Sequence, residues 1–274
     1  MNDITLSPSP SSLSASPLLG PDDPPSFELL NSNGKASVIL VCDHASNAVP
    51  INMDNLGLEA KELARHIAWD IGAAEVTRHL SARLDAPAVF GGYSRLLIDC
   101  NRPPGDPTSI AQVSDGTFIP ANHNLSDAEA DLRCETFFWP YHHAITNTLA
   151  HLWRHGRAPV LVAVHSFTPE FGGLRRPWQV GILWNRDPRL AQPIMERLRA
   201  YPDLNVGDNE PYSGRQLGFT METHAGAAGL AHVEIEIRQD QLADAAGCIQ
   251  WAELLGDILE VVLQDPAVHT VRHY

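Results

Sequence analysis

Two histidines stand at the ends of apolar runs that predict buried strands. His44 follows the run VILV (38–41), and His165 follows the run 159–164. Ligands of open α/β sheets bind outside the carboxyl ends of the strands, so both imidazoles are expected at one edge of a sheet. Neutral imidazole is a common zinc ligand, and catalytic zinc keeps three protein ligands plus water. The pattern favours a metal centre containing His44 and His165 over two purely structural histidines.

The third ligand has two candidates. Asp70 lies in RHIAWDIG (65–72), on a predicted helix face that is otherwise apolar. A carboxylate on a buried face needs a cation or a hydrogen-bond partner, and a metal ion would supply one. The alternative is a simple pair between Asp70 and His66, one helical turn earlier. Asn47 is the weaker candidate for the third ligand.

A predicted strand at 231–238 carries two carboxylates. Glu234 and Glu236 share one face of it, because side chains alternate along a strand. Two carboxylates on one side of an apolar strand are costly unless they are paired or solvated. One of them could serve as the general base on a metal-bound water, while Arg238 on the same face pairs with the other. An internal Glu–Arg pair without a catalytic role is the alternative.

The segment SRLLIDCNR (94–102) places two arginines and an asparagine around a short apolar run, 96–98, which is expected as a strand. Arginine binds carboxylates bidentately and can polarise a carbonyl oxygen. Arg95, Asn101 and Arg102 are therefore candidate substrate-binding residues, with solvated surface charges as the alternative. The following PPG (103–105) fixes the backbone there, which favours a functional role.

The elements that must position these residues alternate between strand and helix. Strands are expected at 37–43, 86–91, 160–165, 179–184 and 231–238, and helices at 59–84, 126–154, 187–200 and 239–263. A capping box, SDAE (126–129), marks the start of the second helix. Long loops are expected at 101–124 and 203–229. The alternation predicts a three-layer α/β/α domain around a mainly parallel sheet.

Composition separates a tail from this domain. Residues 1–34 are rich in serine and proline, and such a segment cannot bury enough apolar surface to offset its ordering entropy. We expect a disordered tail that contributes little to stability. Residues 35–274 are expected to form one domain, because 274 residues with 44% hydrophobic side chains suffice for one sizeable core.

Charge and cysteine content narrow the function and the location. A formal net charge of −14 argues against nucleic acid and anionic membranes as partners, although a local arginine cluster can still bind a small anionic substrate. The four cysteines are scattered without a CxxC pair, which argues against a zinc–thiolate site and against disulfides. No apolar run approaches the roughly 18 residues of a membrane helix, and no secretory signal is recognisable. A cytoplasmic monomer or homodimer is therefore expected.

Eight segments together resemble the N-formylglutamate amidohydrolase family, whose members are similar to zinc carboxypeptidases and aspartoacylases. Their order and spacing over residues 37–262 carry the resemblance more than any single motif. The segments are DHASN (43–47), HIAWDIGA (66–73), SRLLIDCNR (94–102), DGTFIPANHNL (115–125), PYHHAI (140–145), VAVHS (162–166), VGILWNRD (180–187) and EIEIRQD (234–240). The resemblance implies a carboxypeptidase-like fold with a mixed sheet. It also implies a zinc-dependent amidase acting on a small anionic N-acyl amino acid, with N-formylglutamate as the expected substrate.

The resemblance also implies roles for the metal-binding residues. His44 and His165 correspond to the two histidine ligands of zinc. Zinc carboxypeptidases carry a glutamate three residues after the first histidine, whereas this chain has Asn47 there. Because the expected glutamate is missing, Asp70 is the preferred candidate for the third ligand.

Further roles concern the substrate and the proton. By the resemblance, Arg95 polarises the scissile carbonyl, and Asn101 and Arg102 bind the α-carboxylate. Ser46 and Ser166, close to the two histidines, are also expected to bind substrate.

The base is one of the two glutamates of the late strand. Glu236 is preferred, although comparison with distant zinc amidases could select Glu234. Two other functions remain open from the sequence. An amidase acting on a larger peptide or cell-wall amide would need a wide groove. A binding module that has lost its metal would not need the metal ligands, so their presence in this chain counts against it.

Overall fold

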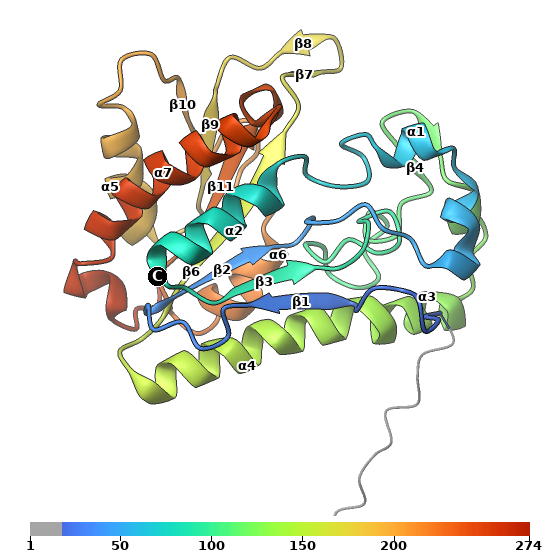
Figure 1. The fold of residues 1–274 in the computed structure, drawn as a ribbon, viewed down its shortest axis with the longest axis horizontal. Helices are drawn as coiled ribbons and strands as arrows, with labels where there is room; N and C mark the ends of the chain where they lie inside the picture. The colour runs from blue at the N-terminus through green and yellow to red at the C-terminus, as the bar shows by residue number, and fades with distance from the viewer. Residues whose placement is uncertain (1–17) are drawn as a thin grey trace, which may run out of the picture.

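A seven-stranded sheet forms the centre of the molecule (Figure 1). The computed structural model describes residues 18–274, and the strands follow the order β1-β3-β2-β6-β11-β9-β10. The strands of this sheet are β1 (Phe27–Leu30), β2 (Val38–Cys42), β3 (Ala88–Gly91), β6 (Val160–Phe167), β9 (Val180–Leu183), β10 (Val206–Asp208) and β11 (His232–Arg238). Two short hairpins lie outside it: β4 (Val113–Ser114) with β5 (Thr117–Phe118), and β7 (Glu170–Phe171) with β8 (Leu174–Arg175).

The sheet is mixed and mainly parallel, as predicted. Strands β3, β2, β6 and β11 are parallel to one another. At one edge β1 is antiparallel to β3, and at the other β9 and its parallel partner β10 run opposite to β11. The carboxyl ends of the four central strands therefore share one edge of the sheet, which is where such folds place their ligands.

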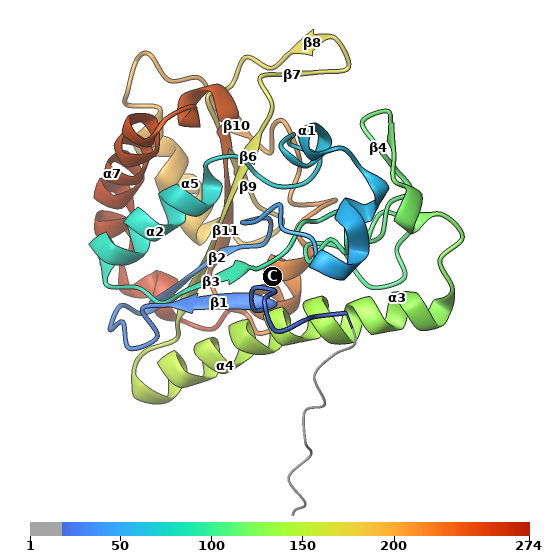
Figure 2. The same ribbon diagram turned by 45° about the vertical axis from the view of Figure 1, so that its right-hand side comes forward.

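Helices cover both faces of the sheet, which confirms the three-layer α/β/α architecture (Figures 1 and 2). Helices α2, α5 and α7 pack against one face, and α4 packs against the other. The helices are α1 (Ala60–Leu63), α2 (Ala73–Leu84), α3 (Asp127–Arg133), α4 (Trp139–His155), α5 (Pro188–Leu198), α6 (Phe219–Met221) and α7 (Ala245–Val262). In the part of the chain that the structure describes, no helix is both long and apolar enough to cross a membrane.

Strand β2 shows why the sequence of the central strands is continuously apolar. Val38 and Leu40 belong to the core under α2, α5 and α7, whereas Ile39 and Val41 belong to the core under α4. All four side chains are fully buried. A strand covered on both faces needs apolar side chains at every position, so the period-two pattern of a half-exposed strand is absent.

The helix predicted at 59–84 is wrong, because the chain forms only the short α1, a series of turns, and then α2 from Ala73. Gly72 explains the interruption. It has a φ of +81°, and a Cβ at this position would lie 2.5 Å from the Cβ of Leu242. Only glycine fits both conditions, so α2 begins directly after it. The interruption leaves Asp70 in a turn rather than on a helix face.

The other helical predictions agree better with the structure. The capping box is present, since Ser126 and Glu129 bond reciprocally, and the helical path continues through a π-helical turn (Cys134–Phe138) into α4. Helix α5 matches the prediction at 187–200, whereas α7 begins only after a 3₁₀ turn at Gln239–Leu242. The strand predicted at 96–98 is wrong: this segment is a turn in which the Leu97 N–H donates to the Ser94 carbonyl at 3.0 Å.

The folded part of the chain begins earlier than predicted. Phe27 and Leu30, placed in the tail by composition, form the ends of edge strand β1, in register with Gly91 and Ala88. Glu28 of the same strand forms an ion pair with Arg78 of α2 at 2.6 Å. Composition misses this strand because its stability comes from pairing with β3 rather than from its own apolar pattern. The prediction of a disordered tail for residues 1–17 lies outside the described residues.

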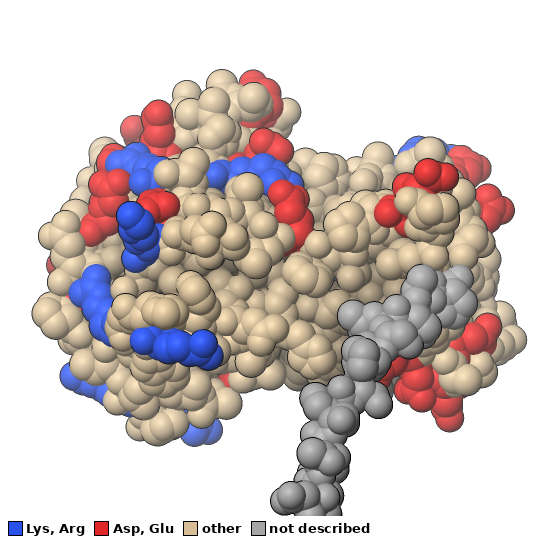
Figure 3. Space-filling model, turned by 60° about the horizontal axis from the view of Figure 1, so that its bottom comes forward, with Lys and Arg blue, Asp and Glu red and all other residues tan. Residues whose placement is uncertain are grey.

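Charged side chains on the face shown in Figure 3 do not merge into one continuous basic surface. Lys and Arg side chains lie mostly at the left of this view, where they are interspersed with uncharged and acidic side chains. Asp and Glu side chains lie at the upper left and on the right. The absence of a continuous basic surface on this face agrees with the formal net charge of −14.

Strand β1 provides the first prediction. A chain that begins at Asn33 should melt roughly 3–8 °C below a chain that begins at Leu18, corresponding to a loss of about 1–2 kcal/mol. The physical reason is the loss of the β1–β3 ladder and of the ion pair between Glu28 and Arg78. Thermal unfolding of both chains followed by circular dichroism measures the difference, and equal melting temperatures would contradict a stabilising role for β1.

Candidate functional site

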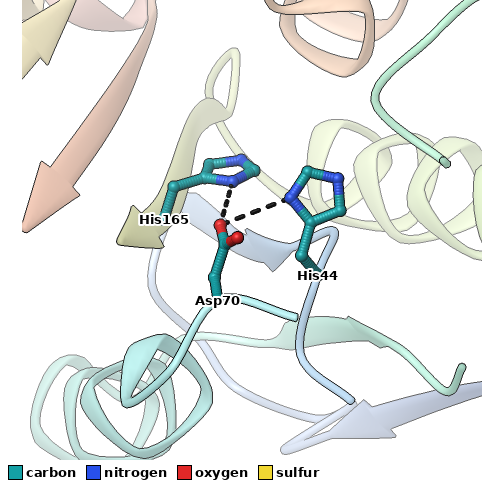
Figure 4. Close-up of side chains that lie close together, drawn as sticks. All are labelled: His44, Asp70 and His165. Atoms are coloured by element: carbon teal, nitrogen blue, oxygen red, sulfur yellow. Dashed lines mark hydrogen bonds and ion pairs between the residues drawn. The ribbon is translucent and has the colours of Figure 1, made fainter. Parts of the chain in front are cut away.

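Two imidazoles and one carboxylate meet at the carboxyl edge of the sheet (Figure 4). The Oδ2 atom of Asp70 lies 3.3 Å from Nδ1 of His44 and 2.8 Å from Nδ1 of His165. All three side chains are buried. The alternative pair between Asp70 and His66 is not formed, because the His66 ring lies 3.6 Å from Asp115 instead.

Three different elements deliver these residues. His44 follows β2 by two positions, and His165 lies within β6, which extends to Phe167. Asp70 comes from the turn before α2, and its N–H donates to the His44 carbonyl at 2.9 Å. Because β2 and β6 are adjacent and parallel, both histidines arrive at the same edge of the sheet. The structure thus brings together the three metal ligands that the sequence proposed.

A second carboxylate holds the outer nitrogen of each histidine. Nε2 of His44 lies 2.7 Å from Asp99, and Nε2 of His165 lies 3.0 Å from Asp43. Such carboxylate–imidazole pairs fix the ring orientation and tautomer of metal-ligating histidines and raise their basicity. Sequence analysis missed both aspartates, although both stand inside motifs that it quoted. The available signal was their place in the sequence: Asp43 directly precedes His44, and Asp99 lies four residues after Arg95.

The carboxylates of the site are held in their ionised form. Burial by itself would raise the pKa of Asp43, but hydrogen bonds from His165 and Thr220 lower it to about 2. The same balance of burial against the charges and hydrogen bonds of both histidines lowers the pKa of Asp70. Burial would also raise the pKa of Asp99, but the pKa is lowered, chiefly by the adjacent Arg95 guanidinium. This guanidinium donates to Asp99 at 2.5 Å and 3.0 Å. Carboxylate oxygens and imidazole nitrogens that converge in this way are suitable donors for a divalent cation.

The two glutamates of β11 face the same region. Glu236 lies opposite His165 in the parallel ladder, while Ile235 and Ile237 belong to the core under α2 and α7. Oε2 of Glu236 is buried and has no hydrogen-bond partner among the described residues. Burial raises the pKa of Glu236 to about 8, and burial also raises the pKa of Glu234. An unpartnered buried oxygen in a native structure points to a water, ion or ligand that belongs there.

The predicted pairing of Arg238 with one of these glutamates is wrong. Arg238 instead donates from Nε to Asp240 at 2.7 Å and from Nη1 to the backbone carbonyls of residues 176–178. Asp240 and these carbonyls lie at the end of β11, within reach of the guanidinium. Glu234 and Glu236 are therefore left to face the cavity.

A cavity of about 140 Å³ lies at this edge of the sheet. It is lined by the proposed metal ligands, both glutamates and four other predicted residues: Arg95, Asn101, Arg102 and Ser166. The cavity also includes residues that sequence analysis did not assign, among them His66, Thr168, Tyr212, Leu217 and Gln239.

Two predicted residues do not reach the cavity. Ser46 accepts the N–H of Ala48 through its Oγ at 3.1 Å, and Asn47 donates its amide to the Leu63 carbonyl at 2.8 Å. Neither side chain lines the catalytic cavity. Both are occupied in shaping the loop after β2, so Asp70 rather than Asn47 completes the donor set.

An α/β sheet that carries two histidines, an aspartate and a glutamate at its carboxyl edge is typical of metal-binding hydrolases. A protein-family model for N-formylglutamate amidohydrolase matches residues 36–243 of the chain. The chain belongs to the N-formylglutamate amidohydrolase family, and its general activity is the hydrolysis of amide bonds.

Two solved structures are similar over nearly the whole chain. A gene product of Agrobacterium tumefaciens is 34% identical, with a TM-score of 0.88 over 91% of this chain and 99% of the other. An N-formylglutamate amidohydrolase from Ralstonia eutropha JMP134 is 19% identical, with a TM-score of 0.61 over 87% of this chain and 97% of the other. The second likeness shows the shared fold. The comparison with curated protein sequences gives no match.

The second prediction concerns the third ligand. Asp70→Ala should lower the affinity for zinc by at least about 10-fold, because it removes one of three converging donors, whereas Asn47→Ala should retain zinc as the wild type does. Elemental analysis after dialysis against limiting zinc measures the metal content of each variant. Full zinc in Asp70→Ala together with loss of zinc in Asn47→Ala would reverse the assignment.

Proposed function

We propose that this protein hydrolyses the amide bond of a small N-acyl amino acid, N-formylglutamate being the reference substrate, with the help of zinc. One observation carries the proposal. Glu236 lines the same cavity as the converging donors of His44, Asp70 and His165, and its buried Oε2 has no hydrogen-bond partner among the described residues. A buried proton acceptor beside a potential metal site is what metal-assisted hydrolysis of an amide needs.

The donor set fits a zinc ion. His44, Asp70 and His165 would hold it through two imidazole nitrogens and one carboxylate oxygen, which is a known combination in catalytic zinc sites. A zinc ion bound there supplies Lewis-acid activation of a water and of the scissile carbonyl. Asp43 and Asp99 keep the two imidazoles oriented for ligation.

Glu236 is the residue best placed to move the proton. It takes a proton from the attacking water and delivers it to the amine nitrogen as the carbon–nitrogen bond breaks. Burial raises the pKa of Glu236, which favours a role as the group that takes up a proton during the reaction. Glu234 lies on the same face, and Asn101 provides a hydrogen bond to it, so this carboxylate is already partnered.

Arg95 supplies positive charge at the reacting carbonyl. Its guanidinium is tied to Asp99 and lies 3.5 Å from Asp70, and it lines the cavity. These contacts fix the arginine before substrate arrives, so it needs little reorganisation as negative charge develops on the carbonyl oxygen.

Arg102 and Asn101 are proposed to bind the α-carboxylate of the substrate. Among the described residues, no carboxylate lies within ion-pair distance of Arg102, whereas most other cavity charges are paired. The Arg102 guanidinium donates to the backbone carbonyl of Asn101 at 2.8 Å, which holds the guanidinium close to the Asn101 backbone. A bidentate guanidinium–carboxylate contact would hold an anionic substrate despite the negative charge of the whole protein.

The function can be tested with a small set of substrates. Purified protein supplied with zinc should hydrolyse one or more of N-formyl-, N-acetyl- and N-carbamoyl-amino acids, as measured by release of the free amino acid. Metal analysis of the same preparation separates an enzyme from a metal-free binding module. Location in the cytoplasm and a monomeric or dimeric state stay predictions.

The third prediction separates the two glutamates. Glu236→Gln should lower kcat about 10²–10⁴-fold, because glutamine keeps the shape of the side chain but cannot accept the proton. Zinc content should not change. Glu234→Gln should have a milder effect, since this residue is assigned no proton transfer. Steady-state kinetics of both variants decide the matter: an inactive Glu234→Gln with a nearly normal Glu236→Gln would reverse the roles, and normal activity in both would remove β11 from the mechanism.

A further inference from the structure

A second space, which we name the outer chamber, adjoins the catalytic cavity. The chamber has a volume of about 420 Å³ and shares His66, Arg95, Arg102 and Tyr212 with the catalytic cavity. These four shared side chains form the boundary between the two spaces, so a substrate that extends past them would enter the outer chamber. The proposed mechanism makes no use of this chamber.

Exposed apolar side chains from both hairpins line the outer chamber. Val113 of β4 is 57% exposed and Phe171 of β7 is 52% exposed. The two hairpins stand out from the body of the protein at the same end as α1 (Figures 1 and 2). Charged side chains, among them Asp99 and Asp115, also line the chamber, so an apolar ligand would contact the side formed by Val113 and Phe171.

The wall that contains Phe171 is held in place. The guanidinium of Arg176 is buried and lies 4.9 Å from the ring centres of both Phe171 and Tyr212, and 5.7 Å from that of Phe167 in β6. This stack ties the tip of the hairpin to the sheet through cation–π contacts. Phe171 therefore forms part of a preformed wall rather than a loose loop.

The neighbouring spaces suggest how a substrate lies. On another side, the catalytic cavity shares Asn101, Arg102 and Leu217 with a pocket of about 380 Å³. Asn101 does not line the outer chamber. If Asn101 and Arg102 hold the α-carboxylate, the amino-acid half of the substrate lies on the Asn101 side. The acyl half, on the other side of the scissile carbonyl, then points toward the outer chamber.

We propose that the outer chamber binds the acyl group of the substrate, and that this enzyme favours N-acyl amino acids with an apolar acyl chain of several carbons. The inference rests on the proposed function and refines its substrate class. N-formylglutamate would fill the catalytic cavity and leave Val113 and Phe171 in water. A longer chain would cover both side chains, and each methylene that it buries contributes about fourfold to binding.

The test compares N-formyl-, N-acetyl-, N-butanoyl- and N-hexanoylglutamate in the zinc-loaded enzyme. The ratio of kcat/KM for the hexanoyl substrate to that for the formyl substrate is measured in the wild type, in Val113→Ser and in Phe171→Ser. Each substitution should lower this ratio about 10-fold, and Phe171→Leu should restore most of it, because leucine is again apolar.

The chain offers matched controls for both substitutions. Phe118 and Leu174 are the register partners of Val113 and Phe171 in their hairpins, are 50% and 75% exposed, and do not line the outer chamber. Phe118→Ser and Leu174→Ser should therefore leave the ratio at its wild-type value. Melting temperatures of all variants show whether a hairpin has been disrupted.

The outcomes separate this inference from the proposed function. Hydrolysis of the formyl substrate with no turnover of longer chains, or an unchanged ratio in Val113→Ser and Phe171→Ser, would overturn the acyl chamber while the amidase function stands. An equal loss of activity on all four substrates would also overturn it, because chain length would then be irrelevant. Failure to hydrolyse any N-acyl amino acid would refute the proposed function itself.

Discussion

The structure depends on the balance of buried charge at the carboxyl edge of its sheet. Three carboxylates and two imidazoles there have almost no contact with water, and they are Asp43, Asp70, Asp99, His44 and His165. Burying an unpaired charge costs several kcal/mol, so each of these groups must find an opposite charge or a hydrogen bond. Every imidazole nitrogen meets a carboxylate, and Arg95 adds a further positive charge beside Asp70 and Asp99. Removing any one member leaves another uncompensated, which makes the cluster a single electrostatic unit.

Regular strands and helices, together with irregular connecting segments, position the residues of this unit. The frame could be predicted from sequence, because strands such as β2 and β6 are apolar at every position and the helices between them are periodic. Edge strand β1 could not, since its hydrogen bonds come from β3 and its four residues, FELL, follow a segment rich in serine and proline. The break at Gly72 was also missed, because the contact with Leu242 that demands glycine joins residues distant in the sequence.

The candidate site shows the same division between local and distant information. His44 and His165 could be recognised because a polar residue at the end of an apolar run is a local signal. Asp70 was selected on the premise of a helix face, whereas the structure places it in a turn bonded to the His44 backbone. Asp43 and Asp99 carry no periodic signal at all. Their role as partners of the histidines requires β2, β6 and the turn after β3 to lie side by side, so their places near His44 and Arg95 in the sequence were only a weak signal.

The inner and outer parts of the site are under different physical constraints. Each nitrogen of His44 and His165 is fixed by a buried carboxylate, so few substitutions would preserve the charge balance. The outer chamber is lined partly by hairpin side chains such as Val113 and Phe171, which are half-exposed and contribute little to the core. Changes there alter what the chamber accommodates at small cost in stability. Under the proposed function, the buried charges would carry out amide hydrolysis, and changes in the hairpins would alter the acyl group that is accepted without disturbing those charges.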